Sequence, residues 1–300
     1  MTETLFFPTV NDSIRDFCKL FNIYNQISTS ETEFELDFSR CRFLRPNAVA
    51  FLGGLVRKME SSRYPVDFNL SSIPNPVSAN LAQNGFLRKN GFLRKICGVT
   101  TPWRGNSIPY REDKILNKDS IIDYLKTKWL QQGWINVSQL LSNRITGNLV
   151  EIYLNAFEHS RSSTGVFTCG QYYPKYKELT LSVADFGVGI PHNVREFSKQ
   201  TGNYQDIKSD HALKWAFQSG TTTTPGPGRG VGLDLLKQFI RVNDGSLLLF
   251  SHDAYVILNK DTEEYIAHGC NFHGTVLHIT LKCDEKLYVL TEELEHKELF

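Results

Sequence analysis

The chain has no strong charge imbalance and no long apolar run, and each absence excludes a class of protein. Its 33 Lys and Arg against 32 Asp and Glu give a formal net charge of +1, so no overall field would hold it on nucleic acid or anionic lipid. No apolar stretch approaches the roughly 18 residues of a membrane-spanning helix. The first residues, MTETLFFPTVNDS, lack the basic region and apolar core of a signal peptide. We expect a cytoplasmic protein with neither a membrane nor a nucleic-acid partner.

Closely spaced cysteine pairs are also missing, because none of the six cysteines belongs to a C-x-x-C motif. This spacing argues against a zinc site or a small disulfide scaffold and favours buried thiols in a reducing compartment. The six are Cys18, Cys41, Cys97, Cys169, Cys270 and Cys283.

Three hundred residues with 41% apolar side chains are enough for two buried cores. Near the N-terminus, residues 34–38 (FELDF) alternate like a strand, Ala48–Lys58 is apolar like a buried helix, and Val66–Leu70 predicts a second strand. The order strand, helix, strand predicts a small α/β module over residues 1–82.

Residues 83–119 are predicted to be a connector, since NGFLRK occurs at 84–89 and again at 90–95 and prolines and glycines follow. Between Arg88 and Arg111 there are six Lys or Arg and no acid. Such a stretch is either a solvated connector or a docking patch for an acidic partner. It is also a candidate contact for a dimer, and the oligomeric state stays open.

Regular patterns return over residues 120–285, the second predicted domain, and residues 286–300 are predicted to be a tail. Late strands with flanking helices indicate an α/β sandwich, a mixed sheet covered on one face by helices. Helices are expected around 120–131, 138–159, 210–217 and 233–242, and strands at 179–183, 247–250, 255–258 and 275–281.

The helix expected over 138–159 carries a polar stripe beside an apolar one. Glu151, Asn155 and His159 are four residues apart and share one face. The amide oxygen of Asn155 suits Mg²⁺, which prefers oxygen ligands, and the carboxylate of Glu151 could take a proton from an attacking water or hydroxyl. Polar residues on a helix face are otherwise simply solvated.

Two glycine-rich loops follow this helix. Asp185, after an apolar strand, could accept a hydrogen bond from an exocyclic amine, and Gly187 and Gly189 permit close backbone approach just before Ile190. The second loop, Gly226–Leu233, opens an apolar helix, whose N-terminus favours an anion such as phosphate. It is neither a Walker loop, since no G-K-[ST] follows, nor a Rossmann fingerprint. Taken singly, each is also compatible with an ordinary turn or a flexible loop.

The order of the three motifs, E-x-x-x-N on a helix, D-x-G-x-G after a strand, and G-x-G-x-G-L at a helix entry, is more specific than any one of them. Residues 138–282 resemble the GHKL superfamily of gyrases, MutL proteins, ninety-kilodalton heat-shock chaperones, sensor histidine kinases and anti-sigma-factor kinases. The resemblance implies a Bergerat-type fold that binds ATP with Mg²⁺.

Carried over by position, the resemblance implies a role for each motif residue. Asn155 would be the Mg²⁺ ligand and Glu151 the general base, while His159 would act in packing. Asp185 would bind the adenine amine, and residues 191–229 would form a lid over the nucleotide. The remaining contacts would come from Gly187, Gly189, Ile190, Gly228, Arg229, Gly230, Val231, Gly232, Leu233 and Thr275.

The N-terminal run FELDFSRCRFLRPNAVAFLGGL resembles a STAS domain, the fold of anti-sigma-factor antagonists, although any β–turn–α unit would also fit. Arg45-Pro46-Asn47-Ala48 stands where that family places its phosphorylated serine, so phosphorylation of this module is in doubt.

Three functions stay open: a regulatory ATPase or switch acting on a protein partner, an anti-sigma-type Ser/Thr kinase acting on a STAS partner, and a scaffold that binds nucleotide without turnover. A phosphorelay kinase is disfavoured, since no dimerising hairpin precedes the motifs. A gyrase-like machine is also disfavoured, because only about 18 residues follow the last strand. Turnover is expected to be slow.

Overall fold

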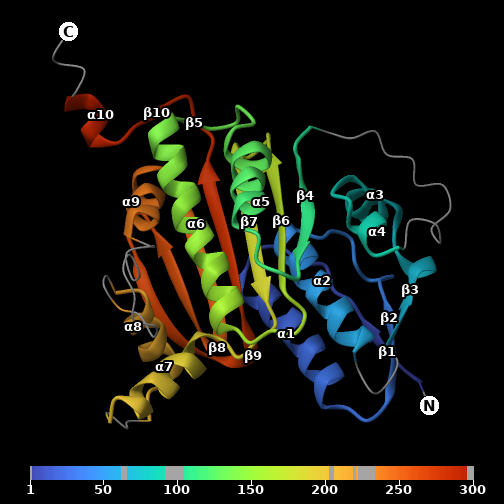
Figure 1. Ribbon diagram of the computed structural model, residues 1–300. Coiled ribbons are helices and arrows are strands. Elements are labelled where there is room, and N and C mark those ends of the chain that lie inside the picture. Colours follow the sequence, from blue (N-terminus) through green and yellow to red (C-terminus); the bar gives the residue numbers. More distant parts are fainter. Residues whose placement is uncertain are drawn as a thin grey trace.

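A computed structural model describes residues 2–61, 66–91, 105–202, 206–218, 221 and 234–295. Its N-terminal part alternates strands and helices, and the three strands form a parallel sheet in the order β1-β2-β3 (Figure 1). The strand, helix and strand expected from the sequence are β2, α2 and β3. The elements are β1 (Thr2–Phe6), α1 (Ile14–Thr29), β2 (Glu33–Asp37), α2 (Pro46–Glu60) and β3 (Val66–Asn69).

Helices α1 and α2 begin at residues that favour a helix start. The Ser13 hydroxyl accepts a hydrogen bond from the backbone N–H of Asp16 at 3.2 Å, and the Asp16 carboxylate lies in the positive first turn. Pro46 occupies the first turn of α2, where its missing N–H has no cost. Most of α2 is buried because it lies between two sheets.

Part of the predicted connector is ordered structure. After η1 (Leu70–Ser72), two short helices, α3 (Asn75–Gln83) and α4 (Phe86–Lys89), lead towards β4 (Ser107–Asp113), which is an edge strand of the C-terminal sheet. Phe86 is 1% exposed and packs on Tyr110 of β4. The C-terminal sheet therefore begins before residue 120, and the second copy of NGFLRK lies largely outside the described residues.

The C-terminal part contains a five-stranded sheet in the order β4-β6-β7-β9-β8. Every pairing between its strands is antiparallel, which corrects the expectation of a mixed sheet. The two strands expected at 247–250 and 255–258 are one strand, because the register shifts near His252, at φ 57°, without ending the pairing. The strands are β6 (Val166–Tyr173), β7 (Glu178–Asp185), β8 (Ser246–Asn259) and β9 (Glu263–Lys282).

Helices cover both faces of this sheet. On one face lies a core that includes Ile145 and Leu149, confirming the helical apolar stripe. The opposite face, expected to be uncovered, packs against the N-terminal helices (Figure 1), and Phe21 of α1 stacks on Phe272 of β9 with ring centroids 4.9 Å apart. The helices that follow β4 are α5 (Lys118–Tyr124), η2 (Leu125–Leu130), α6 (Gln139–His159), α7 (Ile190–Gln200), α8 (Ser209–Ala216) and α9 (Asp234–Val242).

The predicted tail contributes two short elements. Strand β10 (Leu287–Tyr288) pairs in parallel with β5 (Asn136–Val137), just before α6, and α10 (Thr291–Glu295) follows. None of the described helices combines the length and apolar character needed to cross a bilayer.

The cysteines differ from the expectation of free, buried thiols. Cys18 of α1 and Cys270 of β9 form a disulfide between positions 252 residues apart in the sequence. Cys41, Cys169 and Cys283 are buried and free, as expected, and Cys97 lies outside the described residues. The folded chain creates a cysteine pair that sequence spacing does not reveal.

Candidate functional site

Asp185 ends β7 and is buried, with 5% of its surface exposed. Burial raises the pKa of its carboxyl from 3.8 to about 7, while hydrogen bonds from the backbone of Gly187 and from Thr275 oppose that rise. The Gly187 N–H donates to Asp185 Oδ1 at 3.0 Å, and Thr275 stands opposite Asp185 on β9. A carboxyl buried beside a hydroxyl is suited to accept a hydrogen bond from a ligand amine.

The loop after Asp185 passes so close to the end of α6 that only glycine fits at position 187. A Cβ on Gly187 would lie 2.0 Å from the carbonyl oxygen of Ser160, and that oxygen accepts the N–H of Val188 at 2.7 Å. Gly189 has φ 74°, and its Cβ would lie 2.4 Å from the carbonyl oxygen of His273. Both glycines therefore let another backbone segment pass close to the loop, and their contact with a nucleotide stays a prediction.

Ser251 on β8 joins the loop to Thr275. Its hydroxyl accepts the N–H of Ile190 at 2.9 Å, donates to the carbonyl of Gly274 at 3.0 Å, and lies 3.4 Å from the Thr275 hydroxyl. Ser251, which sequence reasoning missed, therefore links the predicted site residues Ile190 and Thr275, and Thr275 pairs with Asp185 across β7 and β9. Ser251 carries no local signal, because its place depends on the register between β8 and β9.

The end of α6 packs directly against this loop. Asn193 of α7 donates its amide N–H to the carbonyls of His159, at 3.0 Å, and Gly189, at 3.2 Å. Asn155 is exposed, and it lies one turn before His159, a rise of about 6 Å along the helix. Glu151, half-buried, lies one turn earlier. The predicted metal ligand and base thus lie on the part of α6 that leads to Asp185.

The second glycine loop lies outside the described residues, including the predicted phosphate-binding positions Gly228–Leu233. The helix that follows it is described, and its start is fixed against α6. The backbone N–H of Leu236 in α9 donates to Asn148 Oδ1 of α6 at 3.0 Å. Asn148 lies one turn before Glu151, so α9 starts beside the helix that carries the predicted base.

Comparison with known proteins decides what this arrangement is. A family model described as "Histidine kinase-, DNA gyrase B-, and HSP90-like ATPase" matches residues 141–285. Residues 141–285 form a GHKL-type ATPase domain. The match covers nearly all of α6, the Asp185 loop and the sheet strands β6, β7, β8 and β9, but not β4. No curated protein matches the chain.

The GHKL domain implies ATP binding, and the described residues fit the adenine end of that ligand. The acceptor oxygens of Asp185 are buried beside the Thr275 hydroxyl, a donor and acceptor set that suits an amine with its neighbouring ring nitrogen. The exposed amide of Asn155 offers an oxygen of the kind Mg²⁺ binds. Phosphate contacts predicted for Arg229 to Gly232 lie outside the described residues.

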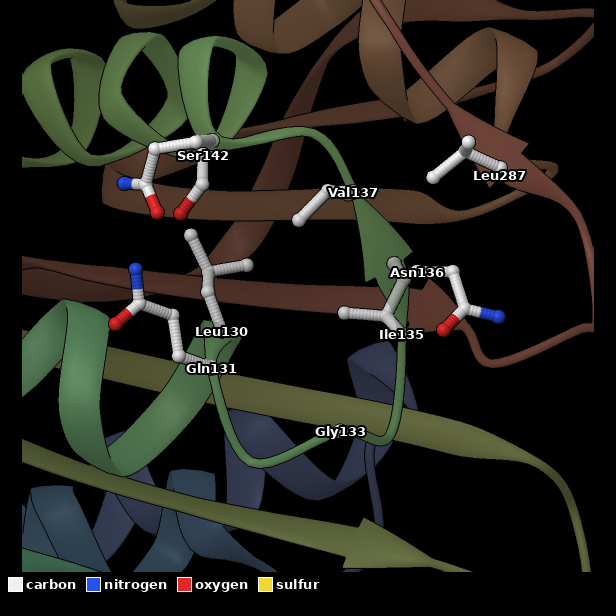
Figure 2. Close-up of a pocket in the computed structure, with 9 residues that line it drawn as sticks. Leu130, Gln131, Gly133, Ile135, Asn136, Val137, Ser142 and Leu287 are labelled. Carbon is white, nitrogen blue, oxygen red and sulfur yellow. The ribbon is translucent and has the colours of Figure 1, made fainter.

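A separate pocket lies near the opposite end of α6, and nearly all of its lining residues lie outside residues 141–285. It has a volume of about 330 Å³ and is lined mainly by the loop from Gln131 to Ile135, β5 and the first turn of α6 (Figure 2). Ser142 lines it, and the helix rises about 27 Å from Ser142 to Ser160. This pocket therefore is not a continuation of the site at Asp185. Its lining residues are Leu130, Gln131, Gly133, Ile135, Asn136, Val137, Gln139, Ser142 and Leu287.

Proposed function

We propose that the chain is a nucleotide-dependent regulatory switch. The GHKL domain binds Mg-ATP, and the N-terminal module transmits the nucleotide state to a protein partner. One observation carries this proposal: Phe186 lies between Asp185 and Gly187 in the sequence, yet its side chain is 3% exposed in the core shared with the N-terminal module. The loop that would bind adenine and the module that would meet the partner are thus joined through one side chain.

The contacts of Phe186 are close. Its ring lies 5.0 Å from that of Phe51 on α2 and 5.1 Å from that of Phe272 on β9. A Cβ on Gly54 of α2 would lie 1.9 Å from the Phe186 ring, so glycine is required for the two to pack. Because interiors are densely packed, movement of Phe186 must displace α2.

The site residues have distinct tasks in the proposed mechanism. Asp185 accepts the adenine amine and holds the base against the loop of Gly187 and Gly189. Asn155 would hold the Mg²⁺ ion through its amide oxygen. Glu151 orients the attacking water and takes its proton. Attack at the γ-phosphorus of a bound ATP would form the new P–O bond and break the bond to the β-phosphate oxygen, with ADP as the leaving group.

The segment that leads into α2 is the candidate surface for the partner. Arg45, which precedes the helix, lies over the ring of Tyr173 at 4.1 Å and pairs with Asp12 at 3.2 Å. Pro46, Asn47 and Ala48 at the start of α2 are buried where both halves of the chain meet, and the exposed residues next to them are Arg42 and Phe43. A change in α2 would alter this surface.

Two neighbouring glycines of α2 provide the test. A methyl group added at Gly54 meets Phe186, whereas one added at Gly53 meets Tyr110 of β4, its hydroxyl 1.9 Å away. Overpacking of either kind costs about 1–3 kcal/mol. We expect Gly54→Ala to weaken nucleotide affinity at least threefold and Gly53→Ala, with a similar loss of stability, to leave it unchanged in calorimetric titrations.

Equal affinities for the two variants would refute the coupling. The fate of the phosphoryl group needs a second experiment, in which the chain is incubated with γ-labelled ATP and cell lysate. Free labelled phosphate identifies the ATPase, and label on a protein hydroxyl identifies the anti-sigma-type kinase instead. No label in either pool leaves a switch that responds to binding alone.

A further inference from the structure

Three side chains that ligate soft metals meet where the N-terminal module touches the GHKL domain. The Nδ1 atom of His268 lies 3.0 Å from the sulfur of Cys270 and 3.6 Å from that of Cys18. All three ligand atoms lie within 4.8 Å of one another. Cys18 and His268 are half-buried and Cys270 is buried, so the cluster is sheltered but open to small solutes.

The fold determines this meeting. His268 and Cys270 are two residues apart on β9, so both side chains point to the same face of the sheet. That face packs on α1, and Asn25 of α1 donates its amide N–H to the carbonyl of Asn271 at 2.8 Å. Cys18 lies about two turns before Asn25 on the same helix. Two backbones fixed by packing thus carry three ligands to one point.

The geometry suits a tetrahedral zinc ion. With Zn–S near 2.3 Å and Zn–N near 2.0 Å, a nitrogen and a sulfur ligand of one ion lie about 3.5 Å apart. In the structure the Nδ1 atom of His268 lies 3.0 and 3.6 Å from the two sulfur atoms, on either side of that value. The backbone N–H of Cys270 donates to Nδ1 at 3.2 Å, so the Nδ1 lone pair must leave this hydrogen bond to bind the metal ion.

We propose that Cys18, His268 and Cys270 form a redox-controlled Zn²⁺ site, with water as the fourth ligand. Reduction of the disulfide gives two thiolates, which bind the ion together with His268. Oxidation by a disulfide such as glutathione disulfide forms the Cys18–Cys270 bond, reduces the oxidant to two thiols and releases Zn²⁺. Both states link α1 to β9 through Cys18, whereas the metal-free dithiol leaves only the packing and hydrogen bonds between these two elements.

Zinc stoichiometry of the full chain tests the site. The chain is reduced with a phosphine, incubated with zinc sulfate, desalted, and analysed for zinc by mass spectrometry. We expect about one zinc per chain for the wild type and for the controls His211→Gln and Cys283→Ser. Cys18→Ser/Cys270→Ser should hold none, and His268→Gln should bind at least tenfold more weakly. Wild type holding no more zinc than the double variant would overturn the proposal.

Two further measurements use the wild type alone, so they do not depend on folding of the variants. Zinc should protect Cys18 and Cys270 from alkylation by iodoacetamide, as read by peptide mass spectrometry, and equal labelling with and without zinc would overturn the site. Glutathione disulfide should then release one zinc for every two thiols lost. Retention of zinc after disulfide formation would refute the exchange.

Discussion

The raised pKa of Asp185 predicts that adenine binding depends on pH. The folded carboxyl has a pKa of about 7, against 3.8 for the ordinary group. An amine that donates to this residue binds the ionised carboxylate best, because charge strengthens the hydrogen bond. Adenine binding should therefore release a proton near neutral pH, and affinity should fall as the pH drops below about 7.

The size of the effect follows from the fraction of ionised Asp185. If the ionised form alone binds, a pKa of about 7 gives about 90% competent protein at pH 8 and about 9% at pH 6. The apparent Kd then rises about tenfold between these two values. Adenosine is the ligand to use in calorimetric titrations, since it has no phosphates that titrate in this range. Repeating the titration in buffers of different ionisation enthalpy counts the released protons.

Asp185→Asn is the matched control, because it keeps an acceptor oxygen and cannot ionise. Its adenosine affinity should be weaker than that of the wild type at pH 8 and should not vary between pH 6 and pH 8. A flat wild-type profile, or the same slope in both proteins, would refute the assignment of Asp185 as the adenine acceptor.

The same shift affects stability without nucleotide. Between about pH 4 and pH 7 the folded protein retains the Asp185 proton that the unfolded chain has released. The residue therefore contributes stability at low pH that is lost as the pH rises to about 7. Asp185→Asn removes that loss, so its melting temperature should exceed that of the wild type by more at pH 8 than at pH 5.

Further variants test the other parts of the proposal. Asn155→Ala should remove most of the stabilisation by Mg-ATP, which for the wild type at a hundred times Kd is about 2.7 kcal/mol in thermal melts. Glu151→Ala should retain nucleotide binding and lose about 10²–10⁴-fold in γ-phosphate release. Residues 105–300 expressed alone should be poorly soluble, because Phe250 and Phe272 lose their cover; a soluble, folded fragment would contradict the shared core.

Short-range patterns were sufficient to predict much of the GHKL domain. Apolar residues at helical spacing locate α6, and the alternation before Asp185 locates β7, because both signals lie within about 20 residues of sequence. Asp185, Ile190 and Thr275 were correctly expected to meet, since the family resemblance adds long-range information. The roles of these three residues in binding nucleotide stay predictions, as do those of Glu151 and Asn155.

The cover on the second face of the sheet could not be predicted from local patterns. In β7, Leu179, Leu181 and Val183 alternate with Thr180 and Ser182, a pattern typical of a strand with one solvated face. Yet Thr180 and Ser182 are both 0% exposed, because the N-terminal helices lie over them. Both hydroxyl groups nevertheless have hydrogen-bond partners inside the protein.

Ser182 shows how a buried polar face is tolerated. Its hydroxyl lies 2.7 Å from Nδ1 of His278 on β9, whose Nε2 lies 3.5 Å from a carboxylate oxygen of Asp12 in the N-terminal module. Burial lowers the pKa of His278 from its ordinary value of 6.5. Asp12 and His278 are more than 260 residues apart in the sequence. No short stretch of sequence therefore predicts that Ser182 and His278 are buried.

Packing around α2 also limits how the two halves can move. Gly53 and Gly54 are neighbours, yet one contacts Tyr110 of β4 and the other contacts Phe186 beyond β7, both too closely to admit a Cβ. Because α2 contacts the sheet at both points, a shift of the helix that relieves one contact disrupts packing at the other and costs free energy. Coupling between two sites is reciprocal. If nucleotide at Asp185 changes the affinity of α2 for a partner, the partner must change the affinity for nucleotide by the same factor.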